Sequence, residues 1–244
     1  MTTSKRIILI TGANKGIGFE TARQLATAGH TVLLAARDAT KAADAVAKLT
    51  AEGLHATAIT LDVTDPASIE RAVAEVGERH GRLDSLINNA GIATEAWGAP
   101  ASQTSVGQWR AIYETNVFAV VAVTQAFLPL LRASEAGRVV NLSSILGSLA
   151  LHADPTSWIY NFKTVAYDSS KSALNAYTIH LAHELKDTTI KVNSAHPGWV
   201  KTELGGEGAN MEIADGARTS VWLATLPDDG PTGGYFHMQD RLPW

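Results

Sequence analysis

Residues 6–18 read Arg-Ile-Ile-Leu-Ile-Thr-Gly-Ala-Asn-Lys-Gly-Ile-Gly, and this stretch decides the fold. Its apolar start lacks polar alternation, which predicts a strand over 6–11 with both faces covered. The strand passes directly into a glycine-rich turn, and a helix is predicted over 16–28. Glycines in such a turn let backbone N–H groups approach a pyrophosphate at the helix N-terminus. The spacing G-x-x-x-G-x-G differs from the usual G-x-G-x-x-G, but its place between a first strand and a helix favours a dinucleotide site.

Strand-like and helix-like segments alternate along the rest of the chain. Further strands are predicted at 31–36, 55–61, 85–88, 138–142, 191–195 and 234–237, and further helices at 40–52, 66–80, 108–133, 165–186 and 213–226. This alternation predicts an α/β fold: a doubly wound parallel sheet of about seven strands with helices on both faces. No linker or repeat divides the sequence, so residues 1–244 are expected to form one domain. Two long segments, 91–106 and 148–164, interrupt the alternation as binding loops do.

Composition narrows the function classes. Hydrophobic residues make up 45% of the chain and charged residues 18%, which is typical of a globular protein with a real core. The net charge of −4 argues against a nucleic-acid partner. The absence of cysteine excludes disulfides, thiolate zinc sites and cysteine nucleophiles. We also see no signal peptide and no apolar stretch approaching the roughly 18–20 residues of a membrane span, so a cytoplasmic location and no membrane contact are expected.

The residues after the second predicted strand bear on the choice of nicotinamide cofactor. An acidic residue there would accept hydrogen bonds from a ribose 2′-hydroxyl and repel a 2′-phosphate. This chain has Arg37 instead, and Lys15 in the glycine turn adds a second cation that can hold a phosphate. Asp38 is an alternative acidic partner, but we interpret it as the N-cap of the next helix. The sequence therefore predicts NADPH/NADP rather than NADH.

A tyrosine and a lysine one helical turn apart indicate acid–base chemistry. Tyr167 and Lys171 open a predicted helix, where residues four apart share a face. A nearby ammonium favours the phenolate, so the pKa of Tyr167 is expected to be lowered towards neutrality. In isolation such a pair is more often an ordinary surface pair. The stretch Asn141-Leu142-Ser143-Ser144, at the end of a strand, supplies hydroxyl groups nearby.

Taken together, these motifs resemble the classical short-chain dehydrogenase/reductases. The resemblance rests on Thr11-Gly12-x-x-x-Gly16-x-Gly18, Asn88-Asn89-Ala90-Gly91, Asn116, Ser144, Tyr167-x-x-x-Lys171 and Pro197-Gly198, which occur in the family's order over nearly the whole chain. The segment from His196 to Thr202 and the final Pro243-Trp244 are most similar to the carbonyl-reductase branch. The resemblance implies a Rossmann-type fold and hydride transfer between NADPH and the carbonyl carbon of a small molecule.

The resemblance also implies a catalytic tetrad of Asn116, Ser144, Tyr167 and Lys171. Tyr167 would protonate the developing alkoxide, or deprotonate an alcohol in the reverse direction. Ser144 would hydrogen-bond the substrate oxygen, with Ser143 as a structural partner. Lys171 would hold the nicotinamide ribose, and Asn116 would anchor a water that links Lys171 to solvent. Only His180 and His183 approach metal-ligand spacing, along a helix flank, so no metal is predicted.

Cofactor contacts are implied at further matched positions. They are Gly12, Asn14, Lys15, Gly16, Ile17, Gly18, Arg37, Asp62, Val63, Asn89, Ala90, Gly91, Tyr167, Lys171, Pro197, Gly198, Val200 and Thr202. For Asn88 and Asn89 an alternative stays open, because side-chain amides at strand ends often pin neighbouring strands.

The chain departs from the family pattern between Ser144 and Tyr167, which lie 23 positions apart, farther than is usual. We expect 148–164 and 200–212 to be substrate-side loops, with the pocket walled by Trp97, Trp158, Tyr160 and Trp199 and suited to bulky or aromatic ketones. The alternative is an apolar patch packed under the loop. The insert also bears on assembly, for which a homodimer is preferred and a monomer stays open.

Two other function classes compete with a carbonyl reductase or alcohol dehydrogenase. An epimerase or dehydratase on this fold usually carries a larger C-terminal substrate domain. A redox sensor that binds NADP(H) without turnover tends to lose the tyrosine or the lysine, and both are present here. Ketone-dependent loss of NADPH absorbance discriminates between these classes.

Overall fold

The computed structural model describes residues 5–94 and 98–244, and its strands form one sheet. The strands are β1 (Ile7–Ile10), β2 (Thr31–Ala36), β3 (Ala56–Thr60), β4 (Ser85–Asn88), β5 (Arg138–Leu142), β6 (Lys191–His196), β7 (Gly234–His237) and β8 (Asp240–Arg241). Their order is β3-β2-β1-β4-β5-β6-β7-β8. All neighbouring pairs are parallel except β7 with β8. The predicted doubly wound sheet is confirmed, and β8 is an addition.

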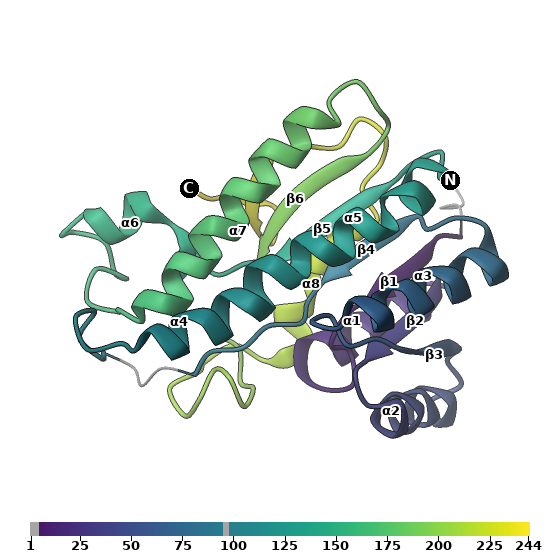
Figure 1. The fold of residues 1–244 in the computed structure, drawn as a ribbon, viewed down its shortest axis with the longest axis horizontal. Helices are drawn as coiled ribbons and strands as arrows, with labels where there is room; N and C mark the ends of the chain where they lie inside the picture. The colour runs from purple at the N-terminus through teal and green to yellow at the C-terminus, as the bar shows by residue number, and fades with distance from the viewer. Residues whose placement is uncertain (1–4, 95–97) are drawn as a thin grey trace.

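Helices cover both faces of this sheet. They are α1 (Gly16–Thr27), α2 (Ala39–Ala51), α3 (Pro66–His80), α4 (Val106–Tyr113), α5 (Ala119–Arg132), α6 (Leu149–Ala153), α7 (Val165–Glu184) and α8 (Ile213–Ala224). Helices α3, α5 and α7 bury their apolar residues in one core, and α5 and α7 cross the front of the sheet in Figure 1. Helices α1, α2 and α8 contribute to a second core on the opposite face.

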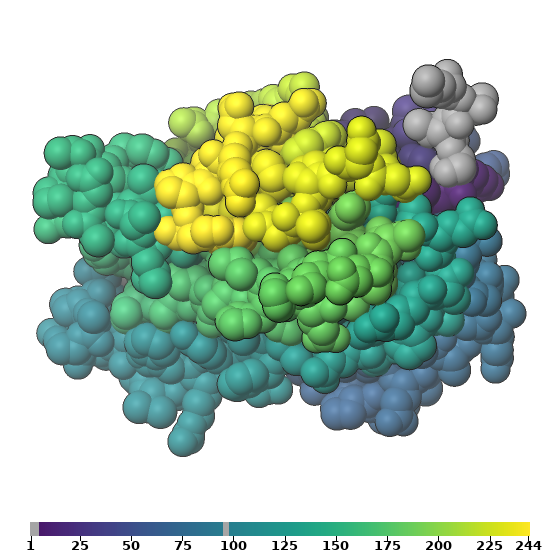
Figure 2. Space-filling view, turned by 90° about the horizontal axis from the view of Figure 1, so that it is seen from above, coloured from purple at the N-terminus to yellow at the C-terminus, as the bar shows by residue number. Residues whose placement is uncertain are grey.

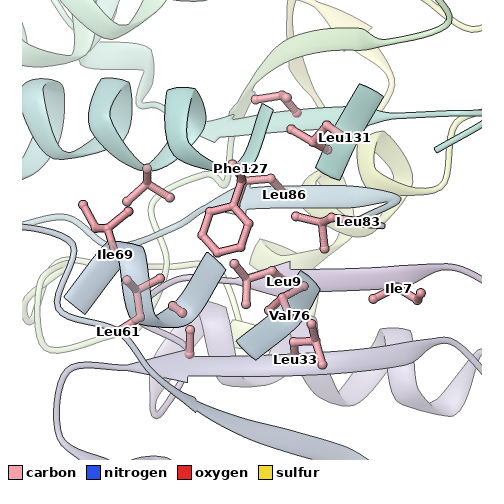
Figure 3. Close-up of a cluster of buried hydrophobic side chains, with 14 of the residues drawn as sticks. Ile7, Leu9, Leu33, Leu61, Ile69, Val76, Leu83, Leu86, Phe127 and Leu131 are labelled. Atoms are coloured by element: carbon pink, nitrogen blue, oxygen red, sulfur yellow. The ribbon is translucent and has the colours of Figure 1, made fainter. Parts of the chain in front are cut away.

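Alternate residues of β1 enter these two cores. Ile7 and Leu9 belong to the first and Ile8 and Ile10 to the second, which is why the strand reads as an unbroken apolar run. Figure 3 shows the ring of Phe127, from α5, among the aliphatic side chains of the first core. Burial of this kind stabilises the sheet by roughly 25 cal/mol per Å² of apolar surface. The core thereby fixes the positions of the carboxyl ends of the strands.

The predicted helix over 108–133 is interrupted by one π-helical turn. Helix α4, the turn η1 (Glu114–Phe118) and α5 follow one another without a break. The run Val106–Arg132 has 27 residues and contains an 18-residue window with a mean hydropathy of 1.4, so by length and composition it is apolar enough to cross a membrane. The sequence expectation that no segment comes close to this was wrong. Val123, Phe127 and Leu131 lie in the first core, however, so much of this apolarity serves packing.

The C-terminal residues brace the insert that precedes α7. The backbone carbonyl of Trp244 accepts hydrogen bonds from the Ala150 N–H at 3.1 Å and the Ser148 hydroxyl at 3.0 Å. The Trp244 ring stacks on Tyr235 of β7, with 5.5 Å between ring centroids. Figure 2 shows this yellow C-terminal end beside the teal segment that carries α6. The insert therefore begins from a point fixed to the sheet.

Candidate active site

The sequence-predicted residues gather where the parallel strands end. Thr11, Arg37, Asn89, Ser143 and Pro197 directly follow β1, β2, β4, β5 and β6, and Asp62 lies two residues after β3. Carboxyl ends of parallel strands meet at one edge of a sheet, and ligands of open α/β folds bind there. The fold thus brings segments distant in sequence to a single edge.

The turn between β1 and α1 has the backbone conformation that glycine favours. Gly12 has φ 62° and Gly16 has φ 59°, both in the left-handed region. A Cβ on Gly12 would also lie 3.0 Å from the Cα of Ala90. At the start of α1, the N-cap residue Lys15 makes no side-chain hydrogen bond to the first helical turn. Those N–H groups, with the positive end of the helix dipole, form a ready anion site.

Asn89 holds this turn in place from the neighbouring strand. Its side-chain amide donates to the carbonyls of Thr11, at 2.8 Å, and Gly12, at 3.1 Å. The Thr11 hydroxyl in return accepts the N–H groups of Asn89 and Ala90. The Asn88 amide donates to Asn141 and so joins β4 to β5. The side chain of Asn88 thus pins two strands, and that of Asn89 pins the glycine turn to the end of β4.

The two predicted phosphate-binding cations lie in different environments. Arg37 is exposed, and among residues 5–94 and 98–244 no carboxylate lies within ion-pair distance of it. Lys15 contacts the carboxylate of Glu203, in the loop after β6. Asp38 accepts the N–H groups of Thr40 and Lys41, so it caps α2 as predicted. The cap commits one Asp38 oxygen to the helix.

Asn116 lies in the π-helical turn and is fully buried. Its side chain exchanges two hydrogen bonds with the backbone of Ile92, both at 2.9 Å, and donates to the Ser170 hydroxyl at 3.1 Å. A Cβ on Gly91 would meet the Asn116 Oδ1 at 3.3 Å and the Lys171 Nζ at 3.6 Å. Asn116 and Lys171 therefore converge on the bare backbone of Gly91.

Ser144, Tyr167 and Lys171 are brought together between β5 and α7. The Tyr167 hydroxyl is hydrogen-bonded to Ser144. The Lys171 ammonium donates to the Leu142 carbonyl at 2.8 Å and lies 5.6 Å from the centre of the Tyr167 ring. Three of the four predicted catalytic residues thus lie together between β5 and α7, and Asn116 meets Lys171 at Gly91.

Burial sets the proton affinities of this group. It raises the pKa of Tyr167 to about 12, with a further contribution from Asp168, and the hydrogen bond from Ser144 opposes this only in part. Burial lowers the pKa of Lys171 to about 8. The expected lowering of the tyrosine pKa is therefore absent from this structure, because desolvation outweighs the favourable interactions.

A cavity of about 110 Å³ opens in front of Ser144 and Tyr167. Predicted cofactor residues that line it are Ile17, Tyr167, Pro197, Gly198, Val200 and Thr202. Trp158, Phe162 and Trp199 form an edge-to-face series along it, with ring centroids 6.2 Å and 6.0 Å apart. The cavity thus joins the predicted chemical groups to an aromatic wall.

Of the four predicted wall residues, Trp158 and Trp199 line the cavity. Tyr160 is not among the residues that line this cavity, and the Lys163 ammonium lies 5.0 Å from the centre of its ring. Phe162, two residues farther along the chain, lines the cavity. Its position in the aromatic insert was the feature of the sequence that could have indicated this. Trp97 lies outside the described residues.

The remaining predicted residues lie at the same edge. The Asp62 carboxylate accepts the backbone N–H and the hydroxyl of Thr64, which hold its pKa below the usual range, and Val63 follows it. Asn14 is part of the glycine turn. Sequence reasoning missed His196, which lines the cavity and ends β6. Its place at a strand end, immediately before Pro197-Gly198, was the signal.

Comparison with known proteins defines the class to which this site belongs. A sequence model of the short chain dehydrogenase family matches residues 6–212, and the chain belongs to that family. The predicted membership is confirmed. Members of this class are oxidoreductases, and this chain is accordingly an enzyme that acts on CH–OH or carbonyl groups.

Individual relatives narrow the comparison. The chain is 42% identical to short-chain dehydrogenase anuI of Penicillium roqueforti, over 91% of this chain and 89% of that protein. It is 32% identical to NADPH carbonyl reductase 1 of Mus musculus, over 100% of both. The crystal structure of NADPH-bound carbonyl reductase from chicken fatty liver is similar with a TM-score of 0.84 and 30% identity, covering 98% of this chain and 99% of that one.

Proposed function

We propose that this protein uses NADPH to reduce ketones and aldehydes to alcohols, with Tyr167 as the proton donor. The observation that carries the proposal is the hydrogen-bonded pair of Ser144 and Tyr167 hydroxyls at the wall of a cavity that Gly198 and Thr202 also line. A carbonyl oxygen placed against both hydroxyls is polarised by one and protonated by the other.

Each member of the tetrad has a separate task. Tyr167 holds its proton at neutral pH, because burial raises its pKa to about 12. Ser144 donates a hydrogen bond to the charge that develops on the substrate oxygen. Lys171 is charged below a pH of about 8 and polarises the tyrosine from the same helix face. Asn116 fixes the π-helical turn and, through an ordered water, connects Lys171 to solvent.

The cofactor fits the residues present. The uncapped first turn of α1 can receive a pyrophosphate, and Lys171 would hold the nicotinamide ribose. The similar chicken enzyme binds NADPH. When bound, NADPH supplies the hydride. Arg37 and Lys15 are the residues that would hold its 2′-phosphate.

Replacing Arg37 tests the cofactor preference. In Arg37→Ala we expect kcat/KM with NADPH to fall about 10- to 100-fold, since a charge-assisted phosphate contact contributes roughly 1.5–3 kcal/mol. The value with NADH should stay within about twofold of wild type. Lys48→Ala, which removes one charge from the far end of α2, is the matched control. A higher kcat/KM with NADH than with NADPH in the wild type would contradict the preference.

The chain is proposed to be one nucleotide-binding domain in which 148–164 and 200–212 are the substrate-side loops. Trp158 and Phe162 come from the first loop, and Leu204 comes from the second. These side chains are apolar and partly exposed, so a bulky or aromatic ketone would cover them. The predicted substrate class is therefore aryl and bulky alkyl ketones.

A pair of truncations tests this wall. We expect Trp158→Ala and Phe162→Ala each to lower kcat/KM for an aryl ketone about 10-fold or more, because each removes roughly 1.5–3 kcal/mol of aromatic contact. Small alkyl ketones should be reduced at the wild-type rate. Tyr160→Ala is the control, because its ring is in the same insert but outside the cavity lining. Equal effects on aryl and small alkyl ketones would contradict the proposal that Trp158 and Phe162 form the substrate pocket.

A panel of ketones tests the reaction itself through the loss of NADPH absorbance. Tight NADPH binding without turnover of any ketone would instead favour the binding-only sensor.

For assembly we propose a homodimer, since Phe118 and Ile179 are exposed on η1 and α7, the layer expected at the interface. Sedimentation measures this directly.

A further inference from the structure

His196 lies between the two turns that carry the proposed chemistry. It is the last residue of β6 and immediately precedes Pro197-Gly198. Its side chain is only 8% exposed, yet it lines the cavity beside Ser144. A buried polar ring at such a position needs defined hydrogen-bond partners.

The ring nitrogen Nδ1 provides the connection. It accepts the Ile145 N–H at 3.1 Å and, more weakly, the Gly198 N–H at 3.4 Å. Ile145 directly follows Ser144, and Gly198 belongs to the turn on the cofactor side of the cavity. An imidazole nitrogen that accepts an N–H carries no proton, so the His196 proton is on Nε2.

A second histidine holds the first in place. His237 of β7 is the register partner of His196, and their ring centroids are 5.0 Å apart. The His237 Nδ1 lies 3.0 Å from the His196 carbonyl oxygen, which can only accept, so His237 donates from Nδ1. Burial, with a smaller contribution from His237, lowers the pKa of His196 to about 3. His196 is thus neutral and can accept at Nδ1 throughout the physiological pH range.

We propose that His196 is a positioning residue that fixes Ser144 relative to the cofactor-side turn. The inference rests on the roles proposed above for Ser144 and for the turn at Gly198. Ser144 caps a 3₁₀ helix of only three residues, Ile145–Gly147, and its hydroxyl accepts the Leu146 N–H at 3.3 Å. So short a helix has little stability of its own. The bond from Ile145 to His196 anchors it to β6.

Three substitutions separate this role from simple packing. His196→Leu keeps apolar bulk and removes the acceptor. His196→Asn restores an acceptor oxygen close to the place of Nδ1, whereas His196→Gln moves the amide one carbon farther out. We expect kcat for ketone reduction to fall about 10- to 100-fold in the Leu and Gln variants, because small misplacements of catalytic groups have effects of that size. His196→Asn should stay within about threefold of wild type, and the Kd of NADPH should change little in all three.

Residue-resolved amide hydrogen exchange gives a readout that is independent of turnover. The Ile145 amide should exchange faster in His196→Leu and His196→Gln than in the wild type, and at the wild-type rate in His196→Asn. Wild-type kcat in a folded His196→Leu, or an equal loss in all three variants, would overturn the positioning role. If the wild type reduces no ketone, the proposed function fails while the Ile145 exchange still tests the anchor. If His196→Leu does not fold, the Asn and Gln variants decide.

Discussion

Tyr167→Phe is expected to lower kcat for ketone reduction about a thousandfold or more, equivalent to about 4 kcal/mol of transition-state stabilisation. The substitution removes one oxygen from a buried ring and leaves intact the packing of α7 against the 3₁₀ helix Ile145–Gly147. It takes away the only phenol that is hydrogen-bonded to Ser144 among the described residues. The Kd of NADPH should stay within about twofold, because a loss confined to the transition state changes kcat and not ground-state binding.

Tyr177→Phe is the matched control for this prediction. It removes the same hydroxyl from the same helix, where Tyr177 is hydrogen-bonded to Thr124 and packs against the first core. We expect wild-type kcat in this variant. Stopped-flow measurement of NADPH oxidation separates the hydride step from product release. A Tyr167→Phe enzyme that reduces ketones at the wild-type rate would refute the assignment of the proton donor.

The architecture could be predicted because both faces of the sheet are buried. An unbroken apolar run such as 32–36 can be satisfied only between two layers of helices, and the strand predicted at 31–36 occurs with those bounds. Asp65 and Pro66 likewise mark the start of α3, where Asp65 accepts the Ala67 N–H. At these points the local residue preferences and the burial favour the same structure, so the sequence pattern was enough to predict the element.

Features held by tertiary contacts could not be predicted. The π-helical turn adds a residue within an otherwise regular apolar helix, and the bonds from Asn116 to Ile92 hold it. Periodicity over 108–133 does not record such an insertion. Helix α6 has five residues and depends on the C-terminal carbonyl for one of its N–H bonds. Strand β8 has only two residues.

The site shows the same division. Sequence motifs named the residues that the fold brings together around Ser144 and Tyr167. Motifs do not record desolvation, so the direction of the tyrosine pKa was wrong, since it depends on how completely α7 is covered. Nor do they record which way a ring of the insert points, and Tyr160 was therefore chosen where Phe162 lines the cavity.

A fully buried arginine lies at the amino-terminal ends of the strands, opposite the candidate active site. Arg138, the first residue of β5, has a relative exposure of 0%. Its guanidinium donates to the backbone carbonyls of Gly137 at 2.8 Å, Thr189 at 3.1 Å, Leu226 at 2.8 and 3.1 Å and Pro227 at 3.1 Å. The one carboxylate within reach among the described residues, Asp228, is largely exposed. Arg138 therefore acts as a multiple donor that ties three loops to β5.

Arg138→Met is expected to lower the free energy of unfolding by about 3–5 kcal/mol, measured by urea denaturation. The carbonyls of Gly137, Leu226 and Pro227 keep a second donor in Arg138→Met, namely the Lys191 N–H, the Arg6 guanidinium and the Gly230 N–H. Methionine fills much of the volume but donates nothing, and each hydrogen bond lost from the charged guanidinium costs roughly 1.5–3 kcal/mol. The loss is smaller than their sum, because the variant no longer desolvates a guanidinium, a cost seen in the lowered pKa of Arg138. Arg132→Met, at an arginine half-exposed on α5, is the control and should change stability by less than about 0.5 kcal/mol. Equal stability of the two variants would mean that water or the remaining donors satisfy these carbonyls, and that they do not need Arg138.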